Sequence, residues 1–257
     1  MFTLDCDRAH LYAHPERELT ADQAQRYDEA LARRATGVPA QYITGHQEFW
    51  GMDLIVSPAV LIPRPETEHV IETVLGLAKP MVSASPTIRI VDIGTGSGAI
   101  ALALARELPG AEILAIDISP EALEIARANA VRHNLAARLE FQIDDLLTGL
   151  PEASFDFVVS NPPYVGESEE DSVQLEVRKF EPRQAVFAGP KGTEVIERLI
   201  PQAQNVLAPG GWLVFEISGT IADSVRHRLA GWTDVRLVND LQGIARVAVA
   251  RKALRGS

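Results

Sequence analysis

A short apolar strand that runs directly into a glycine-rich turn is the feature that most constrains the fold. Residues 88–93 (Ile-Arg-Ile-Val-Asp-Ile) are predicted to form a buried strand, and residues 99–106 to form a helix because they are rich in alanine and leucine. The glycines of the intervening turn permit a tight bend and let the backbone approach a ligand closely. A second strand over residues 112–117 completes a β-α-β unit. The sequence therefore predicts an α/β fold with a nucleotide-like ligand at this turn.

The turn and the end of the second strand supply candidate ligand-binding residues. Asp117 lies about twenty residues beyond the glycines, the spacing at which a carboxylate can accept hydrogen bonds from both ribose hydroxyls. Asp92, at the end of the first strand, is expected to support the turn. Glycine turns also occur for packing alone, but strand, turn, helix, strand and acid together favour a ligand site. The candidate residues of the turn are Gly94, Thr95, Gly96, Ser97 and Gly98.

A second motif follows another predicted strand. Residues 155–160 are apolar, β-branched and aromatic, and they end at Asn161-Pro162-Pro163-Tyr164. Open α/β sheets bind their ligands at the carboxyl ends of their strands. Because both prolines have a fixed φ and no N–H, the loop is stiff, and the Asn161 amide and exposed carbonyls can act as fixed acceptors for an NH2 group. The alternative is an ordinary Pro-Pro turn that the tyrosine covers from solvent.

Together the two motifs resemble those of class I S-adenosylmethionine-dependent methyltransferases. Residues 92–98 with Asp117 are similar to the cofactor site of that class, and residues 161–164 are similar to the target-amine motif of enzymes that methylate planar NH2 nitrogens. DNA adenine methyltransferases and the PrmC/HemK protein-glutamine methyltransferases both carry the latter motif. Further stretches resemble the PrmC/HemK family specifically, and the likeness covers nearly the whole chain. These stretches are residues 41–51, 61–68 and 240–246.

The PrmC/HemK resemblance implies a reaction. A methyl group would pass from S-adenosyl-L-methionine to the side-chain amide nitrogen (N5) of the glutamine in the Gly-Gly-Gln motif of class-one peptide chain release factors, leaving S-adenosyl-L-homocysteine. The resemblance assigns catalysis to Asn161, Pro162 and Tyr164, and it adds Pro163 to the residues that bind the glutamine. Asn161 would border the cofactor as well.

The chain departs from the family pattern at two places. Asp144 and Asp145 stand where some relatives have an acid followed by an aromatic residue, so a carboxylate is available to the adenine amino group but a stacking ring is not. Residues 188–192 (Ala-Gly-Pro-Lys-Gly) replace the usual Gly-Gly-x-Asp-Gly, so no acidic side chain is assigned a role there. Within the family signature, Arg64 and Glu66 are interpreted as an interdomain or substrate-facing pair, with a plain helix-start role as the alternative for Glu66.

Charge separates the candidate substrates. The chain has 24 Lys and Arg against 35 Asp and Glu, a formal net charge of −11. A DNA methyltransferase must approach a polyanion and usually presents a basic face, and here no segment is rich in Lys or Arg. We therefore expect a protein substrate, with N6-adenine methylation of DNA as the alternative and no direct nucleic-acid partner. A non-catalytic adenosine-binding module is a third possibility, but it does not need a clamp for an amine.

The cysteine and histidine content and the hydropathy of the chain indicate whether to expect disulfides, a metal site or a membrane segment. Cys6 is the single cysteine and the six histidines are scattered, so we expect neither an internal disulfide nor a metal site. No apolar run approaches the ~20 residues that cross a bilayer. The first residues lack the apolar core of a signal peptide. We expect a cytoplasmic protein without membrane contact.

Two domains are expected. Residues 1–79 are predicted to be a small, mainly helical N-terminal domain that docks the substrate, with a capped helix over residues 20–35 and a hairpin within residues 41–63. Residues 80–257 are predicted to be a Rossmann-like, doubly wound methyltransferase domain with a closing antiparallel strand. The Pro- and Ser-rich residues 79–86 are the expected linker. Further strands are expected near residues 138–143, 211–217, 235–238 and 244–250, and further helices near residues 66–79, 120–133, 194–207 and 220–230.

Overall fold

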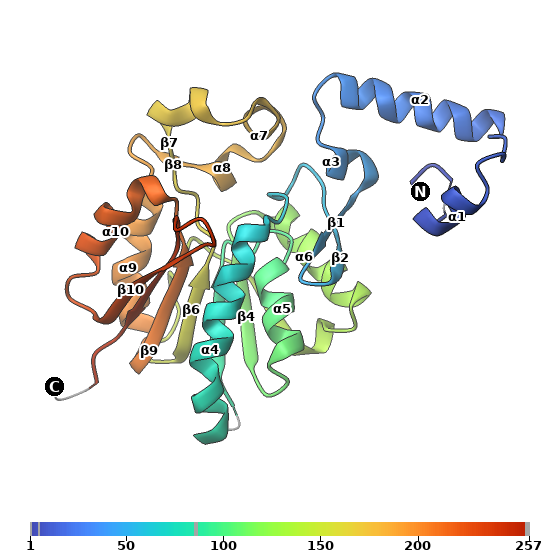
Figure 1. Cartoon of the computed structure of the whole chain (residues 1–257). Coiled ribbons are helices and arrows are strands. Elements are labelled where there is room, and N and C mark those ends of the chain that lie inside the picture. The colour runs from blue at the N-terminus through green and yellow to red at the C-terminus, as the bar shows by residue number, and fades with distance from the viewer. Residues whose placement is uncertain (1, 5, 85–86, 255–257) are drawn as a thin grey trace.

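Helices and strands alternate through most of the chain (Figure 1). The computed structural model describes residues 2–4, 6–84 and 87–254. The helices are α1 (Arg8–Ala13), α2 (Ala21–Ala35), α3 (Ala40–Thr44), α4 (Glu68–Ala84), α5 (Ala99–Glu107), α6 (Pro120–Arg132), α7 (Leu175–Phe180), α8 (Arg183–Val186), α9 (Glu194–Val206) and α10 (Ala222–Arg228). The strands are β1 (His46–Phe49), β2 (Met52–Ile55), β3 (Arg89–Ile93), β4 (Glu112–Asp117), β5 (Leu139–Ile143), β6 (Phe155–Ser160), β7 (Val165–Gly166), β8 (Phe187–Gly189), β9 (Leu207–Glu216), β10 (Thr233–Asn239) and β11 (Ala245–Arg251). Single 3-10 turns are η1 (Pro65–Thr67), η2 (Ala136–Arg138), η3 (Glu167–Ser172) and η4 (Gly219–Ile221).

The central sheet has seven strands in the order β10-β11-β9-β6-β3-β4-β5. Strands β3, β4, β5, β6 and β9 are parallel, whereas β11 pairs antiparallel with both β9 and β10. This order confirms the predicted doubly wound sheet with a closing antiparallel strand. The chain moves outward from β3 to β5 and then returns to place β6 beside β3. The loops after β3 and β6 therefore emerge side by side at the carboxyl edge, which is the position where such sheets bind ligands.

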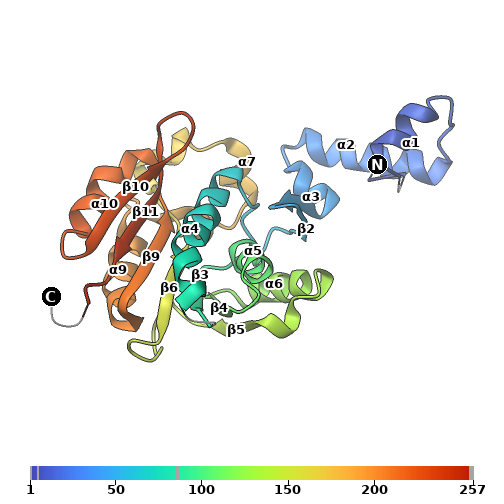
Figure 2. The same cartoon turned by 60° about the horizontal axis from the view of Figure 1, so that its bottom comes forward.

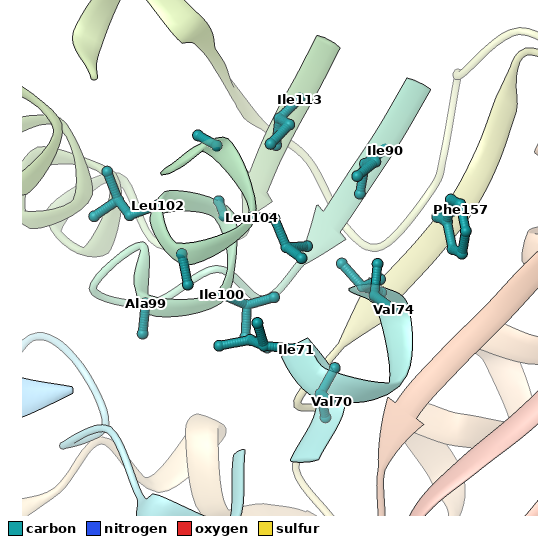
Figure 3. Packing of buried hydrophobic residues seen from close by; sticks show 14 of the residues in the cluster. Val70, Ile71, Val74, Ile90, Ala99, Ile100, Leu102, Leu104, Ile113 and Phe157 are labelled. Atoms are coloured by element: carbon teal, nitrogen blue, oxygen red, sulfur yellow. The ribbon is translucent and has the colours of Figure 1, made fainter. Parts of the chain in front are cut away.

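Both faces of the sheet are covered by helices (Figures 1 and 2). Because successive strand residues point to opposite faces, Ile90 packs with α4 and α5, and its neighbour Val91 packs with α9 and α10. Figure 3 shows the first of these layers, where Val70, Ile71 and Val74 of α4 lie against the sheet. This burial on both faces explains why the parallel strands are continuous apolar runs in the sequence.

The first two helices stand away from the sheet in both views (Figures 1 and 2). Helix α2 has the predicted capping box, in which the Thr20 hydroxyl accepts from the Gln23 amide and the Gln23 side chain accepts from the Thr20 amide. It buries no residue, and Tyr27 and Leu31 are each 49% exposed. The apolar side of this helix is thus uncovered within the described part of the chain.

The β1–β2 hairpin predicted within residues 41–63 is confirmed, with His46 opposite Ile55. One buried side chain joins it to α6 of the sheet domain. The Asn129 amide of α6 accepts from the Ile55 N–H at 2.7 Å and donates to the Ile55 carbonyl at 3.0 Å. It also donates to the Ser97 carbonyl at 2.9 Å, so the hairpin and the glycine turn share one anchor.

The prediction of a linker at residues 79–86 is wrong for residues 79–84, which belong to a helix. Helix α4 runs to Ala84 and continues through Pro80, and Ser85 and Pro86 lie outside the described residues. A proline inside a helix removes one hydrogen bond and crowds the carbonyl four residues earlier. Here Pro80 is exposed and that carbonyl belongs to Gly76, while Val74 and Ala78 remain fully buried and hold the helix on the core.

Among the described residues, no helix is long and apolar enough to cross a membrane.

Candidate active site

The glycine turn after β3 borders a cavity of about 320 Å³ at the carboxyl edge of the sheet. Gly94, Gly96 and Gly98 have φ values of +66°, +55° and +84°, a region that favours glycine. The first two line the cavity together with Thr95 and Ser97. Gly98 instead caps α5, and a Cβ there would lie 3.3 Å from the Ala126 Cβ, so it serves close helix packing.

Asp117 lies at the end of β4 and lines the same cavity. Its carboxylate accepts from the Gly96 amide at 2.8 Å and from the Ser119 amide at 3.0 Å. Burial raises the pKa of Asp117, and these backbone donors act against that rise. The side chain is therefore fixed in orientation and bordered by polar backbone, as a group that receives ribose hydroxyls requires.

Asp92 is fully buried beneath the glycine turn and does not line the cavity. Its Oδ2 atom accepts from the Thr95 hydroxyl at 2.7 Å and from the Ala101 amide at 3.2 Å, while Oδ1 has no hydrogen-bond partner. Burial raises the pKa of Asp92 to about 7. The residue ties the turn to the start of α5.

Asp144 and Asp145 follow β5 and both line the cavity, but their surroundings differ. The Asp145 carboxylate forms an ion pair with Arg198 of α9. Asp144 accepts from the Asp145 amide at 2.8 Å and from the Gln142 side chain at 3.2 Å. Asp144 is thus the better placed of the two to accept a hydrogen bond from an amino group, because its carboxylate forms no ion pair with a described Lys or Arg side chain.

The Asn161-Pro162-Pro163-Tyr164 loop begins where β6 ends beside β3. Ser160 is buried and donates to the Ile93 carbonyl at 2.8 Å, which ties the two strand ends together. Asn161, Pro162 and Pro163 line the same cavity as the glycine turn and Asp117. The structure therefore brings the two sequence motifs to one site.

Tyr164 points elsewhere. It lines a second cavity of about 470 Å³, and its hydroxyl donates to Glu216 Oε1 at 3.0 Å. Burial first, and then the nearby Glu216 carboxylate, raise the pKa of Tyr164. Glu216 is itself 2% exposed, and burial raises its pKa against the hydrogen bonds from Thr67 and Tyr164. Tyr164 therefore lines the second cavity and not the first.

The second cavity lies among the stretches that resemble the family signatures. Arg64, Glu66 and Arg246 all line it. Arg64 forms its ion pair with the buried Glu181 rather than with Glu66, whereas the expectation that both residues face a substrate stays a prediction. Arg246 pairs with Asp240 at 2.8 Å across the turn between β10 and β11.

The divergent loop at residues 188–192 packs against the backbone that follows Pro163. Gly192 has a φ of +80°, and a Cβ there would lie 2.7 Å from the Tyr164 carbonyl oxygen. The Lys191 amide donates to Glu194 at the start of α9. The glycine at the end of this loop is therefore required by close backbone approach, whatever the side chains before it.

Several residues of the site were given no role by the sequence, although Thr67 lies within residues 61–68, which resemble the family signature. Thr67 lines the first cavity, donates to Glu216 Oε2 at 2.6 Å and accepts from Asn161 Nδ2 at 3.1 Å. Glu216 ends an apolar strand, where nothing local marks a carboxylate as part of a site. Arg198 is likewise an ordinary helix residue by its sequence context. The strand pairing of β6 with β9 would have placed Glu216 close to Asn161, since Ser160 lies opposite Phe215.

Solved structures share this architecture. The hMettl16 catalytic domain, solved in complex with MAT2A 3'UTR hairpin 1, superposes with a TM-score of 0.63 at 18% identity, covering 91% of this chain and 81% of that one. A methyltransferase from Pyrococcus furiosus gives a TM-score of 0.55 at 18% identity, covering 91% of this chain and 100% of that one. The fold is that of a class I methyltransferase.

Sequence relatives narrow this to one family. The PrmC N-terminal domain model matches residues 1–45, and the methyltransferase small domain model matches residues 77–179. The release factor glutamine methyltransferase of Koribacter versatilis is 57% identical over 98% of this chain and 88% of its own length, and that of Rhodopirellula baltica is 38% identical over 96% and 85%. The chain belongs to the release factor glutamine methyltransferase family.

Proposed function

We propose that this chain transfers a methyl group from S-adenosyl-L-methionine to the N5 amide nitrogen of the Gly-Gly-Gln glutamine in class-one peptide chain release factors. One observation carries the proposal, namely that the Asn161-Pro162-Pro163 loop and the glycine turn with Asp117 border one cavity. A donor of methyl groups and an acceptor amide can meet there.

The residues of the first cavity fit the cofactor. Gly94 and Gly96 leave room for close approach to backbone, and Asp117 presents a fixed carboxylate to the ribose hydroxyls. Asp144 would accept from the adenine amino group. When bound, S-adenosylmethionine supplies an electrophilic methyl group. Its reaction product, S-adenosylhomocysteine, would be held by the same residues.

The acceptor requires placement and polarisation. An amide nitrogen is a poor nucleophile because its lone pair is delocalised into the carbonyl. If Asn161 Oδ1 and the Pro162 carbonyl accept the two N–H hydrogens, the nitrogen is held in one position and the positive charge that develops on it is stabilised. The stiff Pro162-Pro163 backbone keeps these acceptors fixed before the substrate arrives. Tyr164 supports this loop from the second cavity through Glu216.

A protein substrate is favoured over DNA. The relatives that match 98% and 96% of this chain are named release factor glutamine methyltransferases, whereas none of the names reported above is a DNA methyltransferase. The net charge of −11 also disfavours a duplex partner.

Mass spectrometry tests the reaction directly. A class-one release factor incubated with the enzyme and S-adenosylmethionine should gain about 14 Da on the peptide that contains the Gly-Gly-Gln sequence. Duplex DNA in the same buffer should gain nothing. Methylated adenine in the DNA, with an unmodified release factor, would replace this proposal with the DNA alternative.

The first prediction concerns the cofactor site. Asp117→Ala should weaken binding of both S-adenosylmethionine and S-adenosylhomocysteine by about tenfold or more, since losing hydrogen bonds to a charged group costs ~1.5–3 kcal/mol. Calorimetry gives the affinities, and circular dichroism checks the fold. The nearby Glu121→Ala, on the exposed side of α6, is the matched control. Affinities within twofold of wild type for Asp117→Ala would remove this residue from the cofactor site.

The N-terminal region is proposed to dock the release factor. Helices α1 and α2 stand away from the sheet, and α2 presents Tyr27 and Leu31 to solvent (Figure 1). An uncovered apolar side on a projecting helix is the geometry of a surface that meets another protein. Residues 1–79 would then hold the substrate while its glutamine loop reaches Asn161.

This role leads to a second prediction. The double variant Tyr27→Ala/Leu31→Ala should lower kcat/KM on a whole release factor about 30-fold, mainly through KM, because two truncated contact residues at ~1 kcal/mol each cost ~2 kcal/mol together. Activity on a short Gly-Gly-Gln peptide should stay within twofold, since a peptide does not reach α2. Val131→Ala, at a 67% exposed apolar position on α6, is the control. Equal losses on protein and peptide would assign α2 to stability of the enzyme instead.

A further inference from the structure

Asn161 can clamp an amide only if its own side chain is turned the right way. The side-chain amide has an acceptor face, Oδ1, and a donor face, Nδ2, of nearly equal size and shape. With Oδ1 toward the acceptor glutamine, one N–H hydrogen of the substrate finds an acceptor here, and the other is left for the Pro162 carbonyl. With Nδ2 in that place, two NH2 groups would face each other. The proposed reaction therefore needs a group that selects one orientation.

Thr67 has the contacts to make that selection. Its hydroxyl lies 2.6 Å from Glu216 Oε2, a distance typical of a hydroxyl that donates to a carboxylate. The second oxygen of Glu216 receives the Tyr164 hydroxyl at 3.0 Å. Two hydroxyl donors on two carboxylate oxygens leave Thr67 without a hydrogen for any other neighbour.

The remaining neighbour of Thr67 Oγ1 is Asn161, 3.1 Å away. Because Thr67 has already donated its hydrogen, it can only accept at this contact, so Nδ2 of Asn161 must face it. A flipped amide would bring Oδ1 against Oγ1, two acceptors with no hydrogen between them. A buried contact of that kind costs ~1–3 kcal/mol.

The hydrogen-bond chain from Asn161 through Thr67 to Glu216 spans the two cavities. Thr67 and Asn161 line the cavity of the glycine turn, whereas Tyr164 and Glu216 line the second cavity. The hydrogen-bond chain therefore runs between the two cavities, and Oδ1 is the amide atom left for the substrate. Glu216 is 2% exposed and Thr67 is 3% exposed, so water does not compete for these bonds.

We propose that Thr67 is a positioning residue, whose hydroxyl, bonded to the Glu216 carboxylate, fixes the Asn161 amide with Oδ1 toward the acceptor nitrogen. This rests on the proposed transfer to a glutamine amide. The proposed function needs the Asn161 amide in one orientation, and neither the glycine turn nor the proline loop selects that orientation.

The test is Thr67→Val, which keeps the shape of the side chain and removes the hydroxyl. With the release factor and cofactor both saturating, kcat should fall about tenfold or more, the loss expected for one hydrogen bond that orders a reacting group. The calorimetric affinity for S-adenosylhomocysteine and the KM for the release factor should stay within threefold. Thr67→Ser, which keeps the hydroxyl, should restore kcat to within threefold of wild type.

Thr73→Val is the matched control. Its hydroxyl is bonded to the His69 carbonyl within α4, away from both cavities, so kcat should not change. Wild-type kcat in Thr67→Val, or an equal loss in Thr67→Ser, would overturn the proposal. Absence of release factor methylation by the wild-type enzyme would instead overturn the proposed function on which it rests.

A measurement on the wild-type protein covers the case in which Thr67→Val does not fold. The Asn161 side-chain NH2 signals in a ¹⁵N–¹H spectrum can be assigned by their loss in Asn161→Asp. One of the two hydrogens should exchange more slowly with solvent than the other, because it is bonded to the buried Thr67 hydroxyl. Fast exchange of both hydrogens would show that the amide is not held in this orientation.

Discussion

Asn161→Ala is expected to lower kcat for release factor methylation about 100- to 1,000-fold, the usual cost of removing one fixed group that stabilises developing charge. The variant removes Oδ1, the proposed acceptor for the substrate amide, and leaves the glycine turn and Asp117 unchanged. Affinity for S-adenosylhomocysteine should therefore remain within a few-fold of wild type. Single-turnover kinetics with saturating release factor separate the chemical step from binding.

A matched control distinguishes this loss from a general effect of the substitution. Asn205→Ala makes the same change at an exposed position on α9, and wild-type kcat is expected there. Near wild-type turnover in Asn161→Ala would exclude the amide clamp as the basis of catalysis.

Asn129→Leu is expected to destabilise the protein by about 3 kcal/mol or more. The fully buried Asn129 amide makes three hydrogen bonds, to both backbone groups of Ile55 and to the Ser97 carbonyl. Leucine has a similar volume, so the principal cost is three backbone groups left without partners, the buried Ser97 carbonyl and the half-buried N–H and carbonyl of Ile55, each worth ~1–3 kcal/mol when water is excluded. Urea denaturation measures the change in the free energy of unfolding.

The same variant should also weaken cofactor binding, because Ser97 belongs to the glycine turn and loses its tether. Asn205→Leu is the control, with a change within about 0.5 kcal/mol because the site is exposed. A loss below 1 kcal/mol in Asn129→Leu would mean that water or a shift of the hairpin satisfies Ile55.

The central sheet could be predicted from the sequence because its signals are local. Strands β3 and β6 are apolar runs that stop at a glycine turn and at two prolines, and both stops mark the edge where the site lies. The parallel order then brings the two loops together without any further information. The segment between residues 165 and 193 lacked such a signal, since its short elements are held by contacts with Tyr164 and α9 rather than by a repeating apolar pattern.

The orientation of the clamp could not be predicted in the same way. Thr67 and Glu216 meet across 149 residues, and although Thr67 lies in the 61–68 stretch, nothing in either segment indicates that the two side chains are partners. The substrate-binding role expected for Tyr164 stays a prediction, but its hydrogen bond to Glu216 in the second cavity had no local signal. The Arg64 partner was missed for a similar reason, because Glu181 lies 117 residues away and Glu66 only two. Proximity along the chain did not predict the hydrogen-bond partners, because these partners come from segments far apart in the sequence.

The hydrogen-bond chain from Asn161 through Thr67 to Glu216 has a consequence for synthesis of the protein on the ribosome. Glu216 is the last residue of β9, a strand that enters the sheet between β6 and β11. A nascent chain that has not yet delivered β9 already contains the glycine turn, Asp117 and Asn161, but not the carboxylate that engages Thr67. If Thr67 orients Asn161 as proposed, the clamp is oriented only after β9 has been synthesised and has entered the sheet, and an interrupted chain can carry every residue of the cofactor loop while lacking an oriented clamp.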